Sequence, residues 1–272
     1  MKNDPRTREQ IRLHYEVEKE LAARLLKSTR AERPQLFRKM YGELFAQVPD
    51  HPRLVRRDQA ASSQQSVASQ MTLLRSQLAG VRTFLEFAPG DCRLAFEVCR
   101  YVDKVFAVDI SDQSGEVKET PRNFELIVYD GYQVAVPDQS IDLVFSYQFI
   151  EHLHPDDVPL HFQMVKRILK PDGAYIFSTP HRFSGPHDIS AHFSDTPQGF
   201  HLKEWTYREM GELLKSTGFS VGHPYRSGRP RTSKFVNQSN LAAEALLGAL
   251  PIKLRRALSG RLFQGVTMLV KA

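Results

Sequence analysis

Three acidic side chains follow apolar runs at positions that suit the binding of a nucleoside. Glu86 precedes a Pro89-Gly90 turn and residues that suit the start of a helix, Asp109 ends the next apolar run 23 residues later, and Asp130 ends a third. A carboxylate about 20 residues beyond such a turn can accept hydrogen bonds from both ribose hydroxyls. The pattern predicts a strand–turn–helix junction that binds a nucleotide-type cofactor, with a turn or N-cap role as the alternative for Asp109.

Two further segments, 147–154 and 180–201, are rich in histidine and follow predicted strands at 141–147 and 174–179. They hold six of the ten histidines of the chain: His152, His154, His181, His187, His192 and His201. Imidazole titrates near neutral pH and therefore suits a general base that removes a proton from a hydroxyl. The catalytic candidates are His152, His154, His187 with its neighbour Asp188, and His201. For each of them a structural hydrogen-bonding role is the alternative.

The second histidine-rich segment also contains groups that metals bind. These are His181, His187, Asp188, His192 and Asp195. Their spacing matches no compact metal motif of the HExxH or CxxC kind. We therefore predict that the site contains no metal.

Longer tracts resemble a known enzyme family. The tract IDLVFSYQFIEHL at 141–153 and the tract LKPDGAYIFSTP at 169–180 resemble class I S-adenosylmethionine-dependent methyltransferases, in the subgroup that includes ubiquinone and menaquinone biosynthesis enzymes. The family turn reads acid-x-Gly-x-Gly-x-Gly, and here its glycine positions are Ala88, Gly90 and Cys92. The resemblance covers roughly residues 80–222 and a last strand at 265–271.

The resemblance implies an α/β fold with a Rossmann-like sheet of seven mostly parallel strands and helices on both faces. The last strand would run antiparallel between strands five and six. The cofactor would be S-adenosylmethionine. Its implied binding residues are Glu86, Ala88, Gly90, Asp109, Ile110, Asp130, Gly131, Ser146, Tyr147, Gln148 and Glu151.

Apolar periodicity divides the chain into two parts. Residues 1–80 are predicted to form a helical extension, with helices at 5–30, at 34–48 and from residue 60, that covers the cleft. A coiled-coil dimerisation arm is the alternative, and a homodimer stays open. Residues 81–272 are predicted to form the methyltransferase domain, with a basic helical insertion at 226–264 before the last strand.

The net charge of +6 is unevenly distributed. It is +5 over 1–58, −7 over 59–225 and +7 over 226–261, which suggests an anionic partner for the flanks. Leucines at 254, 258 and 262 alternate with cations in a pattern typical of a basic amphipathic helix. It would contact a membrane surface or an anionic substrate, or form a lid whose leucines pack on the domain. Aromatic residues do not interleave with these cations, which disfavours nucleic acid as the partner.

Composition favours a cytoplasmic enzyme, with peripheral membrane contact as a further expectation. No apolar run approaches the ~20 residues that span a bilayer, and the N-terminus has no secretory pattern. Cys92 and Cys99 lie about 10.5 Å apart along a helix, which is too far for a disulfide.

The predicted activity is O-methylation of a small-molecule acceptor by a histidine base. The acceptor would be a sugar, glycolipid or natural-product hydroxyl, including an anionic or lipid-linked saccharide. Two alternatives remain: an RNA or protein methyltransferase that docks through its basic flanks, and a non-catalytic binding protein with the cofactor fold.

Overall fold

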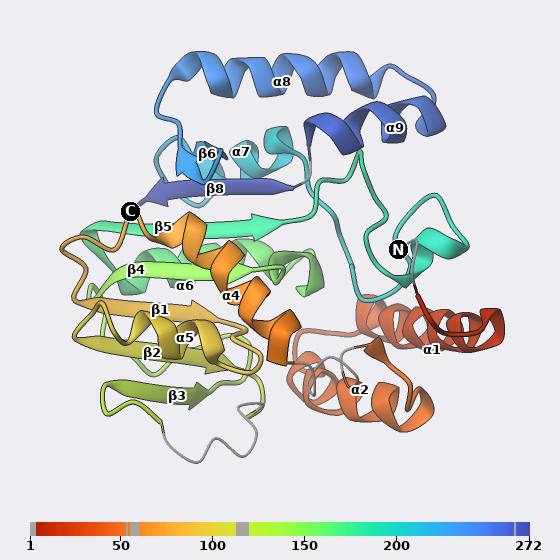
Figure 1. The fold of residues 1–272 in the computed structure, drawn as a ribbon, viewed down its shortest axis with the longest axis horizontal. Helices are drawn as coiled ribbons and strands as arrows, with labels where there is room; N and C mark the ends of the chain where they lie inside the picture. The colour runs from red at the N-terminus through yellow and green to blue at the C-terminus, as the bar shows by residue number, and fades with distance from the viewer. Residues whose placement is uncertain (1–3, 53, 55–59, 113–119, 264) are drawn as a thin grey trace.

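The fold is a sheet of eight strands with helices packed on both faces (Figure 1). The computed structural model describes residues 4–52, 54, 60–112, 120–263 and 265–272. The strands are β1 (Thr83–Phe87), β2 (Lys104–Asp109), β3 (Phe124–Val128), β4 (Ile141–Tyr147), β5 (Leu169–Thr179), β6 (His223–Arg226), β7 (Arg229–Pro230) and β8 (Val266–Lys271). The α-helices are α1 (Arg8–Lys27), α2 (Arg33–Gln47), α4 (Ala60–Leu74), α5 (Arg93–Val98), α6 (Val158–Ile168), α7 (Tyr207–Ser216), α8 (Lys234–Gly248) and α9 (Ile252–Leu262). Two short 3-10 helices, η1 (Ile150–His152) and η2 (Ile189–His192), lie in the loops.

The strand order is β3-β2-β1-β4-β5-β8-β6-β7. Strands β1 to β5 pair in parallel, and β8 lies antiparallel between β5 and β6. This arrangement confirms the predicted Rossmann-like fold class. The eighth strand, β7, is a two-residue extension that pairs only with β6.

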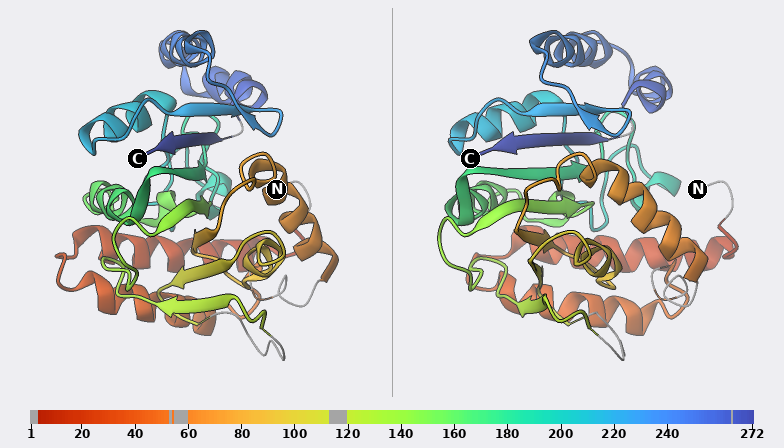
Figure 2. Two further views of the ribbon diagram at one scale, coloured as in Figure 1. Left: turned by 90° about the vertical axis from the view of Figure 1, so that its left-hand side faces the viewer. Right: turned by 60° about the vertical axis from the view of Figure 1, so that its left-hand side comes forward.

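Alternate residues of the central strands enter opposite apolar layers, as expected for a sheet buried on both faces. Leu85 of β1 and Val144 of β4 pack with α6 and α7. Phe84 and Phe145, on the same two strands, pack with α4 and α5 on the other face. The two views of Figure 2 show this layering edge-on. The buried layers hold the loops at the carboxyl edge of the sheet in fixed positions.

Several element boundaries differ from the predicted ones. The first helix begins at Arg8 because Thr7 forms a capping box with Gln10. The helix before β5 ends at Ile168, since Leu169 already pairs with Ile141 of β4. Strand β6 begins at His223, because Phe219 is buried in the apolar layer with α6 and α7 before the strand starts.

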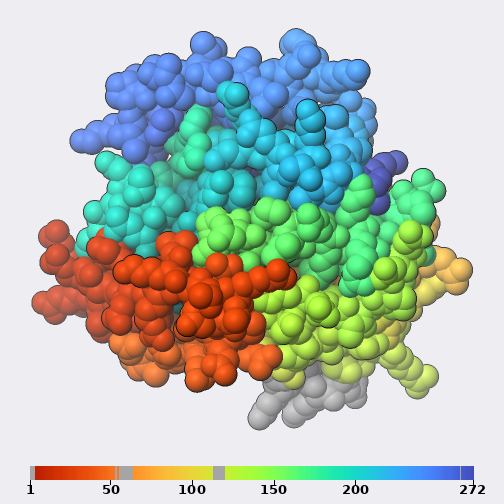
Figure 3. Space-filling view, turned by 180° about the vertical axis from the view of Figure 1, so that it is seen from behind, coloured from red at the N-terminus to blue at the C-terminus, as the bar shows by residue number. Residues whose placement is uncertain are grey.

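The N-terminal helices α1 and α2 pack against each other and against the sheet's carboxyl edge, toward which the parallel strands point (Figure 1). Leu21 and Leu25 of α1 meet Met40 and Leu44 of α2 in a separate apolar cluster, which also contains Phe200 from the loop after β5. Figure 3, a view from behind, shows the red N-terminal helices lying against segments from the middle of the chain, which are green. The apolar stripe of α1 is therefore buried within the chain. Residues 1–3, 53 and 55–59 of the predicted extension lie outside the described residues.

A buried ion pair joins these helices to the sheet. Arg33, the first residue of α2, donates from Nη1 to Asp157 Oδ1 at 2.6 Å, and both side chains are less than a tenth exposed. The second carboxylate oxygen of Asp157 accepts from the Tyr132 hydroxyl at 2.8 Å. Arg33 Nη2 also donates to the carbonyl of Ser28 and to His154 Nε2. One guanidinium thus connects α2 to the loops after β3 and β4.

We expect Asp157→Ala to lower the free energy of unfolding by about 3–5 kcal/mol, because it leaves Arg33 buried without its main counter-charge. The matched control is Asp156→Ala, whose side chain is 78% exposed and lies 3.6 Å from Arg33. This control should change the free energy by less than about 0.5 kcal/mol. Urea unfolding of both variants measures the difference, and equal effects would contradict an anchoring role for Asp157.

Candidate cofactor and acceptor site

A cavity of about 760 Å³ lies at the carboxyl edge of the parallel strands, between the N-terminal helices and the loops after β1, β2, β4 and β5. Eleven of the sixteen predicted site residues line it: Ala88, Gly90, Asp109, Ile110, Gly131, Tyr147, Gln148, His152, His187, Asp188 and His201. The predicted cofactor and acceptor loops therefore face one shared space.

The turn after β1 retains a left-handed backbone at all three positions where the family has glycine. The φ angles are +53° at Ala88, +58° at Gly90 and +59° at Cys92. For the two non-glycine residues this conformation costs roughly 1–2 kcal/mol each. A Cβ placed on Gly90 would meet nothing within 4 Å, and Gly90 lines the cavity. The turn therefore leaves an open cradle next to the backbone.

Two carboxylates flank this turn. Asp109 ends β2, lines the cavity and accepts from the Ser111 amide at 3.3 Å. Glu86 is only 3% exposed, and its Oε2 is a buried atom without a hydrogen-bond partner in the described part of the chain. Burial, with the charges of Asp91 and Asp109, raises the pKa of Glu86 to about 8. With this pKa the carboxyl group is mostly protonated at pH 7, and a cation brought near it would favour its ionised form.

The structure does not bring four of the predicted cofactor residues to the cavity wall. Glu86 lies behind the turn, and Asp130 accepts from the amides of its own loop at 2.8 and 2.9 Å. Ser146 is hydrogen-bonded to the Tyr175 hydroxyl at 2.7 Å, and Glu151 accepts from Thr179 at 2.9 Å. Their roles at the cofactor stay predictions. From these positions they could contact a cofactor through their backbone or through water.

On the acceptor side, His201 is held by a carboxylate that the sequence analysis missed. Glu204 is buried, and its Oε1 accepts from His201 Nδ1 at 2.9 Å. Burial opposes the charged ring of His201, but this hydrogen bond and the charges of Glu151, Glu204 and Asp188 outweigh it and raise its pKa. Burial also opposes ionisation of Glu204, yet its hydrogen bonds to His187 and His201 lower its pKa to about 2. An ionised carboxylate thus fixes Nδ1–H of His201, which leaves Nε2 as the nitrogen that can accept a proton.

The other catalytic candidates make different contacts. His152 donates from Nδ1 to the carbonyl of Phe200 at 2.9 Å, and its ring meets that of His201 edge-on. Asp188 holds its own loop, since its two oxygens accept from the amides of Ser190 and Gly199.

His187 and His154 differ from each other in position. His187 lines the cavity, and its Nδ1 lies 3.3 Å from Glu204. His154 lies outside the cavity against Arg33, where its role is to support the buried ion pair. Which histidine acts as the base stays a prediction, and His201 is the candidate whose ring lies closest to the Glu204 carboxylate, at 2.9 Å against 3.3 Å for His187.

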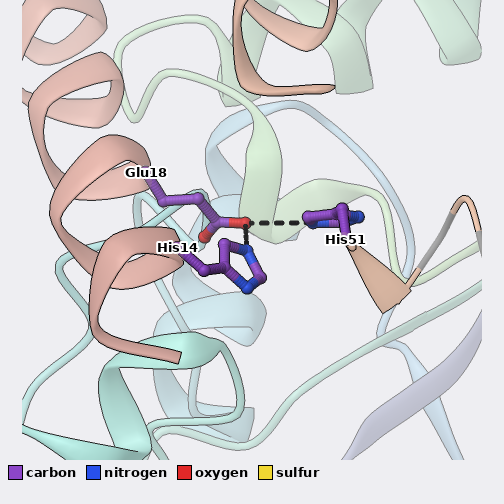
Figure 4. A group of neighbouring side chains, drawn as sticks. All are labelled: His14, Glu18 and His51. Atoms are coloured by element: carbon purple, nitrogen blue, oxygen red, sulfur yellow. Dashed lines mark hydrogen bonds and ion pairs between the residues drawn. The ribbon is translucent and has the colours of Figure 1, made fainter. Parts of the chain in front are cut away.

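A second group of polar residues lines the cavity from the N-terminal side and was not predicted. His14 and Glu18 of α1 meet His51, which follows α2 (Figure 4). Burial opposes ionisation of Glu18, but hydrogen bonds from both histidines outweigh it and lower its pKa to about 2. The spacing of four residues between His14 and Glu18 is a signal that could have shown them on one helix face.

Among the described residues, two groups have donor atoms close enough for a metal ion: His14 with Glu18 and His51, and Glu151 with His152 and His201. None of the five metal-type residues named from the segment 181–195 belongs to either group. His181, for example, is fully buried and hydrogen-bonded to Glu244 at 2.7 Å.

The basic helix predicted near the C-terminus is α9. Its leucines at 254, 258 and 262 are 49%, 40% and 52% exposed, so they do not pack on the domain as a lid would require. Within the described residues, no helix combines the length and apolar character needed to cross a membrane. Cys92 and Cys99 are free thiols, as predicted.

Fold and cavity define a class I α/β domain with a nucleotide-type cofactor site, and comparisons with known proteins specify the family. A family model described as a methyltransferase domain matches residues 85–177. A probable S-adenosylmethionine-dependent methyltransferase of Mycolicibacterium smegmatis is 37% identical over 93 residues, 33% of this chain and 32% of that protein. One of Mycobacterium tuberculosis is 29% identical over 143 residues, 51% of this chain and 48% of that protein. The chain thus spans a third to a half of the length of these relatives.

A solved structure extends the likeness of the fold. A Burkholderia thailandensis 1,6-didemethyltoxoflavin-N1-methyltransferase with bound S-adenosylhomocysteine has a TM-score of 0.56 and 14% identity, covering 90% of each chain. The family match over residues 85–177 and the curated relatives together identify a class I S-adenosylmethionine-dependent methyltransferase domain in this chain. This confirms the predicted family and its cofactor, S-adenosylmethionine, whereas the ubiquinone-type subgroup stays a prediction. The open cradle at Gly90 and the Asp109 carboxylate, which both line the cavity, fit this cofactor.

We expect Glu86→Gln to stabilise the ligand-free protein at pH 8. The ordinary pKa of this carboxyl group is 4.5 and the folded value is about 8, so the unfolded state loses its proton first as the pH rises. Relative to the variant, the wild-type free energy of unfolding should therefore fall between these two pH values, by about 3–5 kcal/mol in total. Urea unfolding of both proteins at pH 5 and pH 8 measures it. A difference that is the same at both pH values would show that the pKa of Glu86 is not raised.

Proposed function

We propose that the protein is an S-adenosylmethionine-dependent O-methyltransferase that acts on a hydroxyl group of a small molecule. The observation that carries this proposal is the hydrogen bond between Glu204 and His201, because His201 lines the same cavity as the cofactor turn and Asp109. A carboxylate-oriented imidazole is the arrangement that general-base catalysis on a hydroxyl uses. A neutral amine can attack the methyl group without first losing a proton, so it depends less on such a base.

The cofactor, when bound, supplies a methyl group already activated on a sulfonium sulfur. The chain's own contribution is to align the acceptor and to handle its proton. Asp109 and the turn around Gly90 would hold the nucleoside and methionine parts. His201 would take the hydroxyl proton at Nε2, while Glu204 stabilises the resulting imidazolium through Nδ1.

The acceptor class is proposed to include anionic or lipid-linked saccharides. Support comes from the excess of positive charge over 226–261 and from the exposed leucines of α9 beside the exposed Lys253 and Arg261. Such a surface suits an anionic molecule with an apolar portion. Peripheral membrane contact, a cytoplasmic location and a homodimer stay predictions.

Cofactor binding tests the first half of the proposal. We expect Gly90→Val and Asp109→Ala each to weaken S-adenosylhomocysteine binding at least about tenfold, or ~1.4 kcal/mol, since one fills the cradle and the other removes the acceptor for the ribose hydroxyls. Gly80→Val is the control for the first variant, because Gly80 has a φ of +80° and open surroundings but does not line the cavity. Asp103→Ala, at an exposed ion pair, is the control for the second. Isothermal titration measures the affinity of all four variants for S-adenosylhomocysteine. A wild type that does not bind it would refute the cofactor site.

Methyl transfer tests the second half. With radiolabelled cofactor and a panel of sugar, glycolipid and phenolic hydroxyl acceptors, we expect His201→Gln to lower kcat by about 10²–10⁴. Because the raised pKa of His201 sets where the base loses its proton, Glu204→Gln should shift the acidic limb of the pH profile of kcat/KM to lower pH. His223→Gln, on β6 away from the cavity, should leave activity intact. Label transfer to RNA, protein or amines alone would refute hydroxyl specificity.

A further inference from the structure

The cluster of His14, Glu18 and His51 is assembled from two segments that the cavity brings together. His14 and Glu18 lie one turn apart on α1, and both are almost fully buried on its inner face. His51 follows α2 by a few residues, where its amide donates to the carbonyl of Val48 at 3.0 Å. Figure 4 shows the three side chains pointing toward one another.

Their donor atoms converge on one point. Glu18 Oε1 lies 2.8 Å from His14 Nε2 and 3.6 Å from His51 Nε2. One donor atom from each residue lies within 4.8 Å of the other two. Bonds of about 2.0–2.1 Å to a tetrahedral zinc ion place neighbouring donors about 3.3 Å apart, so the observed separations bracket that value. Small side-chain shifts would suffice to admit an ion.

The ligand set is chemically selective. Two imidazoles and one carboxylate are a common set for Zn²⁺ and related divalent transition metals, whereas Mg²⁺ and Ca²⁺ prefer oxygen ligands alone. We propose that His14, Glu18 and His51 form a binding site for a divalent transition metal of the zinc type. This goes against the sequence-based prediction of no metal.

The surrounding contacts orient the ligands. The second carboxylate oxygen of Glu18 accepts from the Phe200 amide at 3.3 Å, which leaves Oε1 directed at the histidines. The rings of His14 and His51 meet edge-on with centroids 4.5 Å apart, and Phe45 packs against His51 at 5.2 Å. Such supporting contacts are what keep metal ligands in place.

Arg6 contacts the ring nitrogen of His14 that faces away from Glu18. Its Nη1 lies 2.9 Å from His14 Nδ1, and a guanidinium can only donate. His14 therefore accepts at Nδ1 and donates the Nε2 proton to Glu18. Binding of a metal at Nε2 displaces that proton, so the neutral ring must carry its proton at Nδ1 and Arg6 must leave, while remaining paired with Asp4.

Three protein ligands leave at least one coordination position of such an ion unfilled. All three residues line the cavity, so that position is reachable by a molecule within it. This is the arrangement of a zinc site that binds a further ligand, not of a closed structural site. An oxygen atom of the acceptor would be a suitable ligand, and this last point alone rests on the proposed function.

Metal titration of the full-length, cofactor-free protein tests the site. After dialysis against chelator, we expect the wild type to bind one equivalent of Co²⁺ with visible d–d absorption, and Zn²⁺ to displace it. His51→Ala and Glu18→Gln should each weaken binding at least about tenfold. Because no cofactor or acceptor is present, the result does not depend on whether the methyltransferase proposal is correct.

Two controls make the outcome specific. His152→Ala removes a member of the other metal-type group and should bind Co²⁺ as the wild type does. Arg6→Ala removes a neighbouring cation and no ligand, so it should bind at least as tightly. No binding by the wild type, loss only in His152→Ala, or an equal loss in Arg6→Ala would each overturn the assignment.

Discussion

The closed cavity depends on the buried ion pair between Arg33 and Asp157. Without it, the N-terminal helices would be held to the sheet's edge mainly by apolar contacts such as those of Phe200 with α1 and α2. The pair is hydrogen-bonded on both sides, by Tyr132 to the carboxylate and by the Ser28 carbonyl to the guanidinium. If one partner is removed, the remaining charge stays buried without water or a counter-charge. The folded state is therefore destabilised. The ion pair therefore contributes to the stability of the cavity wall that the N-terminal helices supply.

The cavity combines strained backbone with buried carboxyl groups, both of which oppose folding. Ala88 and Gln148 adopt positive φ at its wall, and Glu86 is buried with one oxygen unpaired. Strain and unpaired polar groups concentrate at functional sites because a ligand can relieve them. A cationic group brought near Glu86 would favour its ionised form and so offset part of the cost of burying it.

The two sides of the cavity differ in origin and in chemistry. The family match covers residues 85–177, which contain the cofactor turn and Asp109. The acceptor side is built from outside that range, by Glu204 and His201 and by the His14–Glu18–His51 cluster. The matched range thus contains the cofactor turn, whereas His201, Glu204 and the cluster on the N-terminal helices lie outside it. Function resides in such sites more than in the fold itself.

Local sequence pattern was enough to predict the central strands, because runs such as 141–147 are mostly apolar and local periodicity decides a buried strand. It also located Asp109 and Gly90, whose spacing along one strand–turn–helix unit is local. Tertiary structure alone decided which distant side chains meet. Glu204 with His187, Arg33 with Asp157, and His51 with Glu18 are brought together by packing between elements far apart in the chain. Periodicity carries no information about such pairs, since the position of a loop depends on every layer beneath it.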